Sequence, residues 1–90
     1  MFERNEQEKS KKYFKQSAEE GYELAYAEYA SILYLDKIDV DEAEVYFKKA
    51  EDCNYLPAPH AYNYGKLLIQ ERNEVERGNS YLDWAEGDNY

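Results

Sequence analysis

The sequence predicts an all-α fold, a short right-handed α–α superhelix of about five antiparallel helices. Similar segments recur along the 90-residue chain: YFKQSAEEGY at 13–22, YFKKAEDCNY at 46–55 and YLDWAEGDNY at 81–90, spaced by 33 and then 35 residues. A period of this length accommodates two antiparallel helices with their two turns. Repeated signals for helix starts and helix ends follow the same spacing. The whole chain, 1–90, is therefore expected to form a single helical-repeat domain.

The expected helices group into a half repeat and two full repeats. Their ranges are 3–20, 23–35, 40–53, 58–71 and 74–87. The half repeat covers 3–20, the first full repeat covers 23–53 and the second covers 58–87. Pro57 and Pro59 place the start of the fourth helix, because a residue without an amide proton suits a first turn.

Start signals recur at the second helix of each full repeat. Asp39 is followed by Glu42, and Asn73 by Glu76, in the pattern of an N-cap with a carboxylate three residues later. The two pairs are 34 residues apart, which supports the same period.

Each copy of the motif also carries a large apolar residue, a small residue and a helix-ending residue. The large and small pairs are Phe14 with Ser17, Phe47 with Ala50, and Leu82 with Ala85. The ends are Gly21, Asn54 and Asn89, residue types that tolerate the left-handed conformation. A large side chain beside a small one lets a neighbouring helix approach closely, so these pairs are expected in the core.

The distribution of charged residues distinguishes the expected inner helices from the expected outer helices. The segment ELAYAEYASILYL, 23–35, carries only Glu23 and Glu28 as charges, so it is expected to be packed on nearly every side. The segment DEAEVYFKKAEDC, 41–53, has a clear polar face. The first helix of each pair is therefore expected inside and the second outside.

The segment EAEVYFKKAEDCNYLPAPHAYNYGKLL resembles the Sel-one-like repeat, a branch of the tetratricopeptide superfamily. Ala43, Phe47 and Ala50 fit the second helix of the tetratricopeptide pattern, and Ala30 and Gly65 match the small inner-helix position. The likeness covers about residues 10–90, although the linker LDKIDVD lacks the glycines usual in Sel-one-like units. The resemblance implies a protein-binding adaptor or scaffold whose inner helices line a concave surface.

Composition limits the partners. The formal charge is −9, and it lies wholly in residues 21–90, which hold 15 acids and 6 bases. Phosphate binding needs clustered lysine and arginine, so neither nucleic acid nor an anionic membrane is an expected partner. No apolar run approaches the roughly 20 residues of a membrane span and no secretory signal is present, which predicts a cytoplasmic location. The lone Cys53 agrees with a reducing compartment.

Catalysis and metal binding find no support in the residue types. The chain has one His, one Cys and no glycine-rich phosphate loop, so it is predicted not to be an enzyme and to need no cofactor or metal. The acidic segment DKIDVDEAE looks like a calcium loop, but the twelfth position is Phe47 counted from Asp36 and Ala50 counted from Asp39. A bidentate glutamate is required there, so calcium is excluded.

A second line of residues on the two inner helices is the predicted protein-binding surface. It contains polar and apolar positions beside the core line, and Trp84 on the last helix joins it because an aromatic ring occupies a position that other copies keep polar. The candidates are Glu28, Ile32, His60, Asn63, Tyr64, Leu67 and Trp84. The alternatives are that Ile32 and Leu67 contact each other, that His60 is a packed helix-start residue, and that Trp84 covers the open end.

The predicted function is a non-enzymatic adaptor that binds a protein or peptide of basic and apolar character. An acidic inhibitor that imitates nucleic acid in the basic groove of a nuclease or DNA-binding enzyme is the alternative, because net charge does not separate the two. A stack this short leaves its ends exposed, which a homodimer or a larger partner would cover.

Overall fold

The computed structural model describes residues 2–87, with side chains from residue 8 onward, and it contains five α-helices and no strand in that range. The helices are α1 (Phe2–Glu19), α2 (Glu23–Leu35), α3 (Val40–Asp52), α4 (Ala58–Arg72) and α5 (Val75–Gly87). The all-helical prediction is confirmed, and every helix end lies within one residue of its expected position. In the described range, no helix combines the length and the apolar character needed to cross a membrane.

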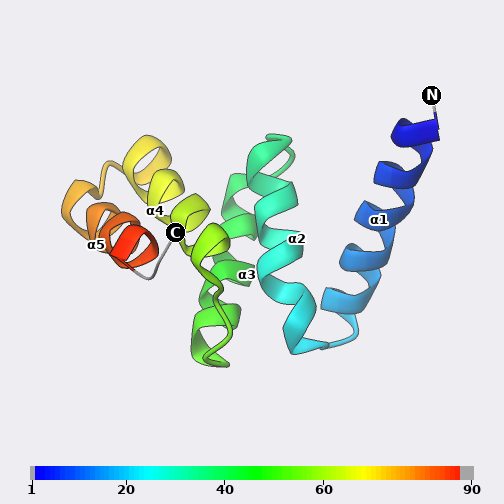
Figure 1. Cartoon of the computed structure of the whole chain (residues 1–90), viewed down its shortest axis with the longest axis horizontal. Helices are drawn as coiled ribbons and strands as arrows, with labels where there is room; N and C mark the ends of the chain where they lie inside the picture. The colour runs from blue at the N-terminus through cyan, green and yellow to red at the C-terminus, as the bar shows by residue number, and fades with distance from the viewer. Residues whose placement is uncertain (1, 88–90) are drawn as a thin grey trace.

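Neighbouring helices pack against each other in chain order, with the hairpins α2–α3 and α4–α5 clearly visible in Figure 1. α4 also contacts α2, so it lies against three helices, whereas α1 packs against α2 and no other described helix. Figure 1 shows α1 diverging from α2 toward its N-terminal end. α2 is flanked by α1, α3 and α4, and its seven buried residues confirm the expectation of packing on most sides. Only its ends, including Leu24 and Leu35, are largely exposed.

Helix ends follow the sequence signals with one exception. The Asp39 carboxylate accepts a hydrogen bond from the Glu42 amide at 3.0 Å, as an N-cap does. Gly21 and Asn54 adopt positive φ angles of 92° and 58°, as predicted, while Asn89 lies outside the described residues. Pro57 is the residue before α4, as its missing amide proton suggested.

The assignment of Asn73 as the N-cap of the last helix is wrong. Asn73 ends α4 in the left-handed conformation, with φ 59°, and the backbone amide of the next residue, Glu74, donates to the Leu68 carbonyl at 2.9 Å. α5 begins at Val75. Asparagine can cap either end of a helix, and in this short connection Asn73 caps the end of α4 instead of the start of α5.

The core contains a column of aromatic rings that crosses three helices. Phe47 on α3 is fully buried and stacks on Tyr64 of α4, with ring centroids 5.0 Å apart and planes 13° apart. Tyr64 in turn packs on Tyr81 of α5, with ring centroids 4.7 Å apart. These three residues are spaced by 17 residues each, half of a 34-residue repeat. Of the predicted pairs of large and small residues, Phe47 and all three small residues, Ser17, Ala50 and Ala85, are buried, whereas Phe14 and Leu82 are only partly buried.

Candidate functional site

The inner helices α2 and α4 are joined by a cluster of polar side chains. Glu28 and Ser31 lie one turn apart on α2, and His60 and Asn63 lie one turn apart on α4, so each pair shares a helix face. The His60 ring nitrogens lie 2.6 Å from Ser31 Oγ and 2.9 Å from Glu28 Oε1. Asn63 Nδ2 donates to Ser31 Oγ at 3.1 Å. Three of the predicted site residues therefore meet in one place.

The hydrogen bonds of this cluster form a directional chain. A carboxylate only accepts, so His60 Nε2–H donates to Glu28, and in the neutral imidazole Nδ1 then accepts from the Ser31 hydroxyl. The Ser31 oxygen accepts from Asn63, which completes the chain. Ser31 is only 5% exposed and its hydroxyl is engaged on both sides. Through these hydrogen bonds the cluster links α2 to α4.

Ser31 is the member of this cluster that the sequence interpretation missed. A serine three residues after Glu28, facing a histidine and an asparagine with the same spacing, was the available signal. A second link beside it has the same character: the Tyr34 hydroxyl donates to Gln70 Oε1 at 2.6 Å, again from α2 to α4. In the described residues, no buried side-chain nitrogen or oxygen lacks a hydrogen-bond partner.

The apolar members of the predicted surface do not form an accessible groove. Tyr64 and Leu67 are fully buried core residues, and Ile32 is half-buried. Because α4 packs against α2, α3 and α5, little of its circumference is left for a ligand. Tyr64 is held further by Arg77, whose Nη2 donates to the tyrosine hydroxyl at 3.2 Å. Burial raises the pKa of Tyr64 to about 12, against the smaller lowering effect of Arg77.

Trp84 borders an open groove between the end of α3, the α3–α4 connection and α5, and we name it the α3–α5 groove. Its volume is about 680 Å³, and its lining residues are Glu51, Asn54, Tyr55, Leu56, Pro57, Ser80, Tyr81 and Trp84. Trp84 is 49% exposed and Tyr55 is 41% exposed, so two aromatic rings offer surface to solvent. Tyr55 and Tyr81 were missed by the sequence interpretation, although both stand in the recurring motif that supplied Trp84.

Local structure explains why these side chains converge. Asn54 ends the α3 segment in the left-handed conformation, and the three residues that follow run without regular structure to the start of α4. This turn places Tyr55 and Leu56 opposite α5. The Tyr81 hydroxyl donates to Glu51 Oε2 at 2.5 Å, which joins α5 to the end of α3. Burial, followed by this hydrogen bond, raises the pKa of Tyr81. The groove therefore has an apolar, aromatic lining with one carboxylate at its edge.

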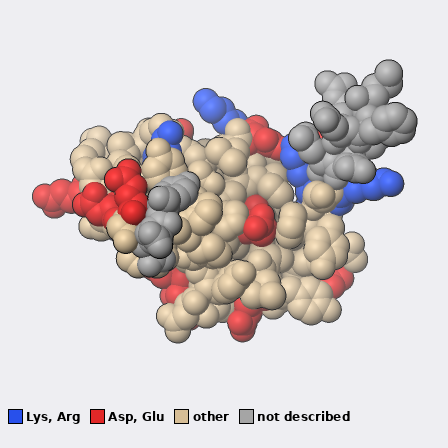
Figure 2. Space-filling model, in the orientation of Figure 1, with Lys and Arg blue, Asp and Glu red and all other residues tan. Residues whose placement is uncertain are grey.

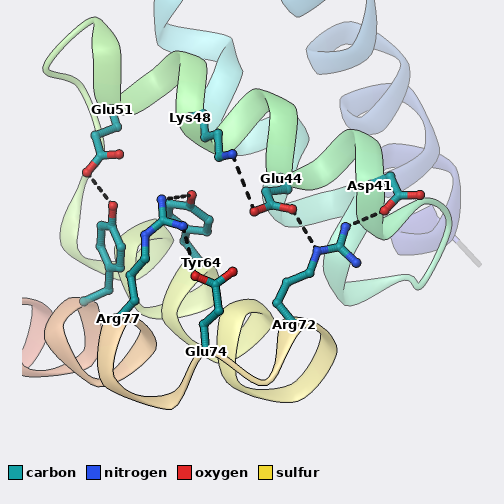
Figure 3. Close-up of polar contacts among 9 residues, drawn as sticks. Asp41, Glu44, Lys48, Glu51, Tyr64, Arg72, Glu74 and Arg77 are labelled. Carbon is teal, nitrogen blue, oxygen red and sulfur yellow. Dashed lines mark hydrogen bonds and ion pairs between the residues drawn. The ribbon is translucent and has the colours of Figure 1, made fainter.

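Charged side chains pair along the neighbouring face (Figure 3). Arg72, near the end of α4, donates from Nε to Glu44 Oε1 at 2.8 Å and from Nη2 to Asp41. Lys48 lies 3.8 Å from the other Glu44 oxygen, and Arg77 donates to Glu74 at 3.3 Å. The hydrogen bonds to Glu44 and Asp41 raise the pKa of Arg72. Two of the five acidic residues of α3, Asp41 and Glu44, are thus paired with cations of the same chain.

The remaining candidates for chemistry are weak. Burial raises the pKa of the half-buried Cys53 thiol, and Glu23 and Asp52 act in the same direction, which disfavours the reactive thiolate. Among the described side chains, no three of the metal-binding types His, Cys, Asp and Glu come together.

Comparisons with models of protein families, with curated proteins and with solved structures gave no match for this chain.

Proposed function

We propose that this protein is a non-enzymatic interaction module that binds a segment of a partner protein in the α3–α5 groove. The observation that carries the proposal is the half-exposed Trp84, which lines a groove of about 680 Å³ together with Tyr55 and Tyr81. Tryptophan and tyrosine are the residue types that most often supply binding energy at protein interfaces. A groove of this size accommodates a few side chains of an extended peptide or one face of a helix.

The lining favours a ligand with an apolar or aromatic side chain next to a lysine or arginine. Leu56, Pro57 and the aromatic rings provide the apolar contact, and Glu51 provides a carboxylate at the edge. The net charge of −9 attracts a basic segment during encounter. The proposed ligand is therefore the basic and apolar peptide expected from the sequence, bound on the outer side of the chain rather than by the inner helices.

A Sel-one-like helical stack is part of the proposal, and the internal equivalences support it. The fully buried Ala30 and Ala43 of the α2–α3 hairpin lie 35 residues before Gly65 and Gly78 of the α4–α5 hairpin, so both hairpins carry small residues at the same positions. The first helices of the two hairpins, α2 and α4, contact each other directly. Such a contact is what a right-handed superhelix of hairpins requires.

The engagement of acidic groups within the chain favours a peptide-binding module over a nucleic-acid mimic. Asp41 and Glu44 contact Arg72. Asp36 pairs with Lys11 at 2.6 Å. A mimic needs rows of carboxylates that face a basic partner, whereas these three carboxylates already pair with cations of their own chain.

Selection from a displayed library of random peptides on the immobilised full-length chain tests the proposal. Retained peptides are synthesised and titrated while the fluorescence of Trp84, the only tryptophan, is followed. Enrichment of aromatic and basic residues, together with a fluorescence change on binding, is the expected result. Binding by oligolysine alone, steeply weakened by salt, would favour the mimic.

Two variants locate the binding surface, and their affinities are measured by isothermal titration calorimetry because Trp84→Ala removes the fluorophore. Trp84→Ala should weaken binding at least about tenfold, because loss of an anchor ring typically costs 2 kcal/mol or more. Tyr22→Ala is the matched control, since Tyr22 is an exposed aromatic residue that lies on the α1–α2 turn, outside the groove. Equal affinity of the parent chain and the Trp84→Ala variant for the selected peptides would place the site elsewhere.

A further inference from the structure

α1 exposes a face that its structural counterpart α3 buries. Tyr13 precedes Tyr46 by 33 residues, the spacing of the first two motif copies, yet Tyr13 is 65% exposed and Tyr46 only 9%. Tyr46 packs on Tyr26 and Tyr29 of α2, with ring centroids 5.8 Å and 5.0 Å away. α1 has no described helix in the corresponding place, because it contacts α2 alone. This face of α1 is therefore built for a neighbouring helix and lacks one in the described structure.

The exposed face carries a definite order of charges. Lys9, Tyr13, Gln16 and Glu20 are spaced by four, three and four residues, so they form one line along the helix and its end, and all four are exposed. The line borders a hollow of about 850 Å³ between α1 and the start of α2, lined by Tyr13, Phe14, Gln16, Ser17, Glu20, Gly21, Tyr22, Glu23, Leu24 and Ala25. A cation thus lies at one end of the line, a carboxylate at the other, and a tyrosine near the middle.

This order is complementary to itself when two copies of α1 lie antiparallel. Lys9 and Glu20 are equidistant from the midpoint between residues 14 and 15, and so are Tyr13 and Gln16. A two-fold axis through that midpoint places Lys9 of one copy beside Glu20 of the other, twice, and Tyr13 beside Gln16, twice. Such an interface is isologous, because the same surface of each subunit meets across the two-fold axis, and it produces a closed dimer.

We propose that a second copy of this chain docks on the Lys9–Tyr13–Gln16–Glu20 line, giving a dimer with antiparallel α1 helices. Charge complementarity distinguishes this occupant from an unrelated helix, because an antiparallel copy brings its own Glu20 to Lys9 and its own Lys9 to Glu20. Figure 2 shows basic side chains gathered mainly over α1, with acidic ones spread over the rest of the visible face. The proposal is independent of the α3–α5 groove, which lies at the other end of the molecule.

Sedimentation velocity on the full-length chain, from low to high micromolar concentration, tests the proposal with charge reversals. Lys9→Glu places two glutamates together at each contact, and Glu20→Lys places two lysines together, so each variant alone should remain monomeric. An equimolar mixture of the two variants should associate, because both contacts then join a glutamate to a lysine. The double variant Lys9→Glu/Glu20→Lys should also regain the parent's concentration dependence.

Lys48→Glu is the control, since it makes the same change in net charge at an exposed residue of α3. It should associate like the parent chain, and far-UV circular dichroism should show unchanged helix content in every variant. A parent chain that stays monomeric at all concentrations overturns the dimer. So does a parent dimer that persists in Lys9→Glu and Glu20→Lys, because association would then use another face.

Discussion

Gly65 and Gly78 bring the backbones of α4 and α5 into direct contact. A Cβ atom on Gly65 would lie 2.6 Å from the Gly78 carbonyl oxygen, and one on Gly78 would lie 2.6 Å from the Gly65 carbonyl oxygen. The neighbouring atom on each side is backbone, which cannot rotate out of the way. The close crossing of these two helices therefore depends on the absence of both side chains.

Gly78→Ala is expected to destabilise the protein, by about 1–3 kcal/mol, the usual cost of overpacking. Its Cβ would also meet Ile69 Cγ1 at 2.4 Å, and the gain of about 1 kcal/mol in helix propensity does not offset the strain. Urea unfolding followed by circular dichroism measures the difference. Gly87→Ala is the control, because nothing lies within 4 Å of its Cβ, and it should leave stability unchanged or slightly raised.

Phe47→Ala should cost about 3–5 kcal/mol, because it leaves a cavity beneath the Tyr64 ring. Against a total stability of about 5–15 kcal/mol, this loss is expected to unfold a large part of the population at 37 °C. Thermal and urea unfolding measure it, with Val45→Ala as an exposed control on the same helix. A loss below about 1 kcal/mol would show that Phe47 is not a central core residue.

Stability should fall at alkaline pH. Burial raises the pKa of Tyr29 and of Tyr64 to about 12, above the ordinary value of 10.0. The folded state therefore holds these protons more tightly, so the stabilisation is complete below pH 10 and is lost as pH rises through about 12. Urea midpoints at increasing pH measure the effect. Tyr64→Phe removes one ionising group and should show a shallower alkaline loss, and an identical pH profile would contradict this origin.

Ser31→Ala tests the polar link between α2 and α4. The change leaves His60 Nδ1 and Asn63 Nδ2 without their shared hydroxyl, and a partly buried polar group without its partner costs about 1–3 kcal/mol. Ser80→Ala is the matched control, because its hydroxyl donates to the Glu76 carbonyl at an exposed position. That variant should change the free energy of unfolding by less than about 0.5 kcal/mol. Equal effects of the two changes would argue against the link.

Helix positions were predictable because their signals are local. The Asp39 cap and Pro57 each act within a few residues, and the structure places the helix ends accordingly. Asn73 was misassigned because the same residue type caps both ends of helices, and only the length of the connection decides between them. The left-handed Lys37, with φ 54°, gave no sequence signal, since lysine is not a residue type that favours this conformation.

The candidate site was predictable only in part, because it depends on how the helices sit together. Glu28, His60 and Asn63 were placed on one line of the inner helices and they do share one hydrogen-bonded cluster, but the role of Ser31 between them depends on the register of α2 against α4. Tyr64 was predicted to lie on the binding surface but is buried, because the periodicity of α4 alone does not reveal that three helices, α2, α3 and α5, pack against it. The groove beside Trp84 depends on the path of the α3–α4 connection, which no periodic pattern describes.

The column of aromatic rings formed by Phe47, Tyr64 and Tyr81 couples the unfolding of α5 to the unfolding of α3 and α4. Detaching α5 would strip Tyr81 from Tyr64 and uncover the ring that supports Phe47, so α3, α4 and α5 are expected to melt as one cooperative unit. α1 has no ring in this column and rests on α2 alone. Its amides should therefore exchange with solvent deuterium first, well before those of α4, and pairing with a second copy would slow that exchange.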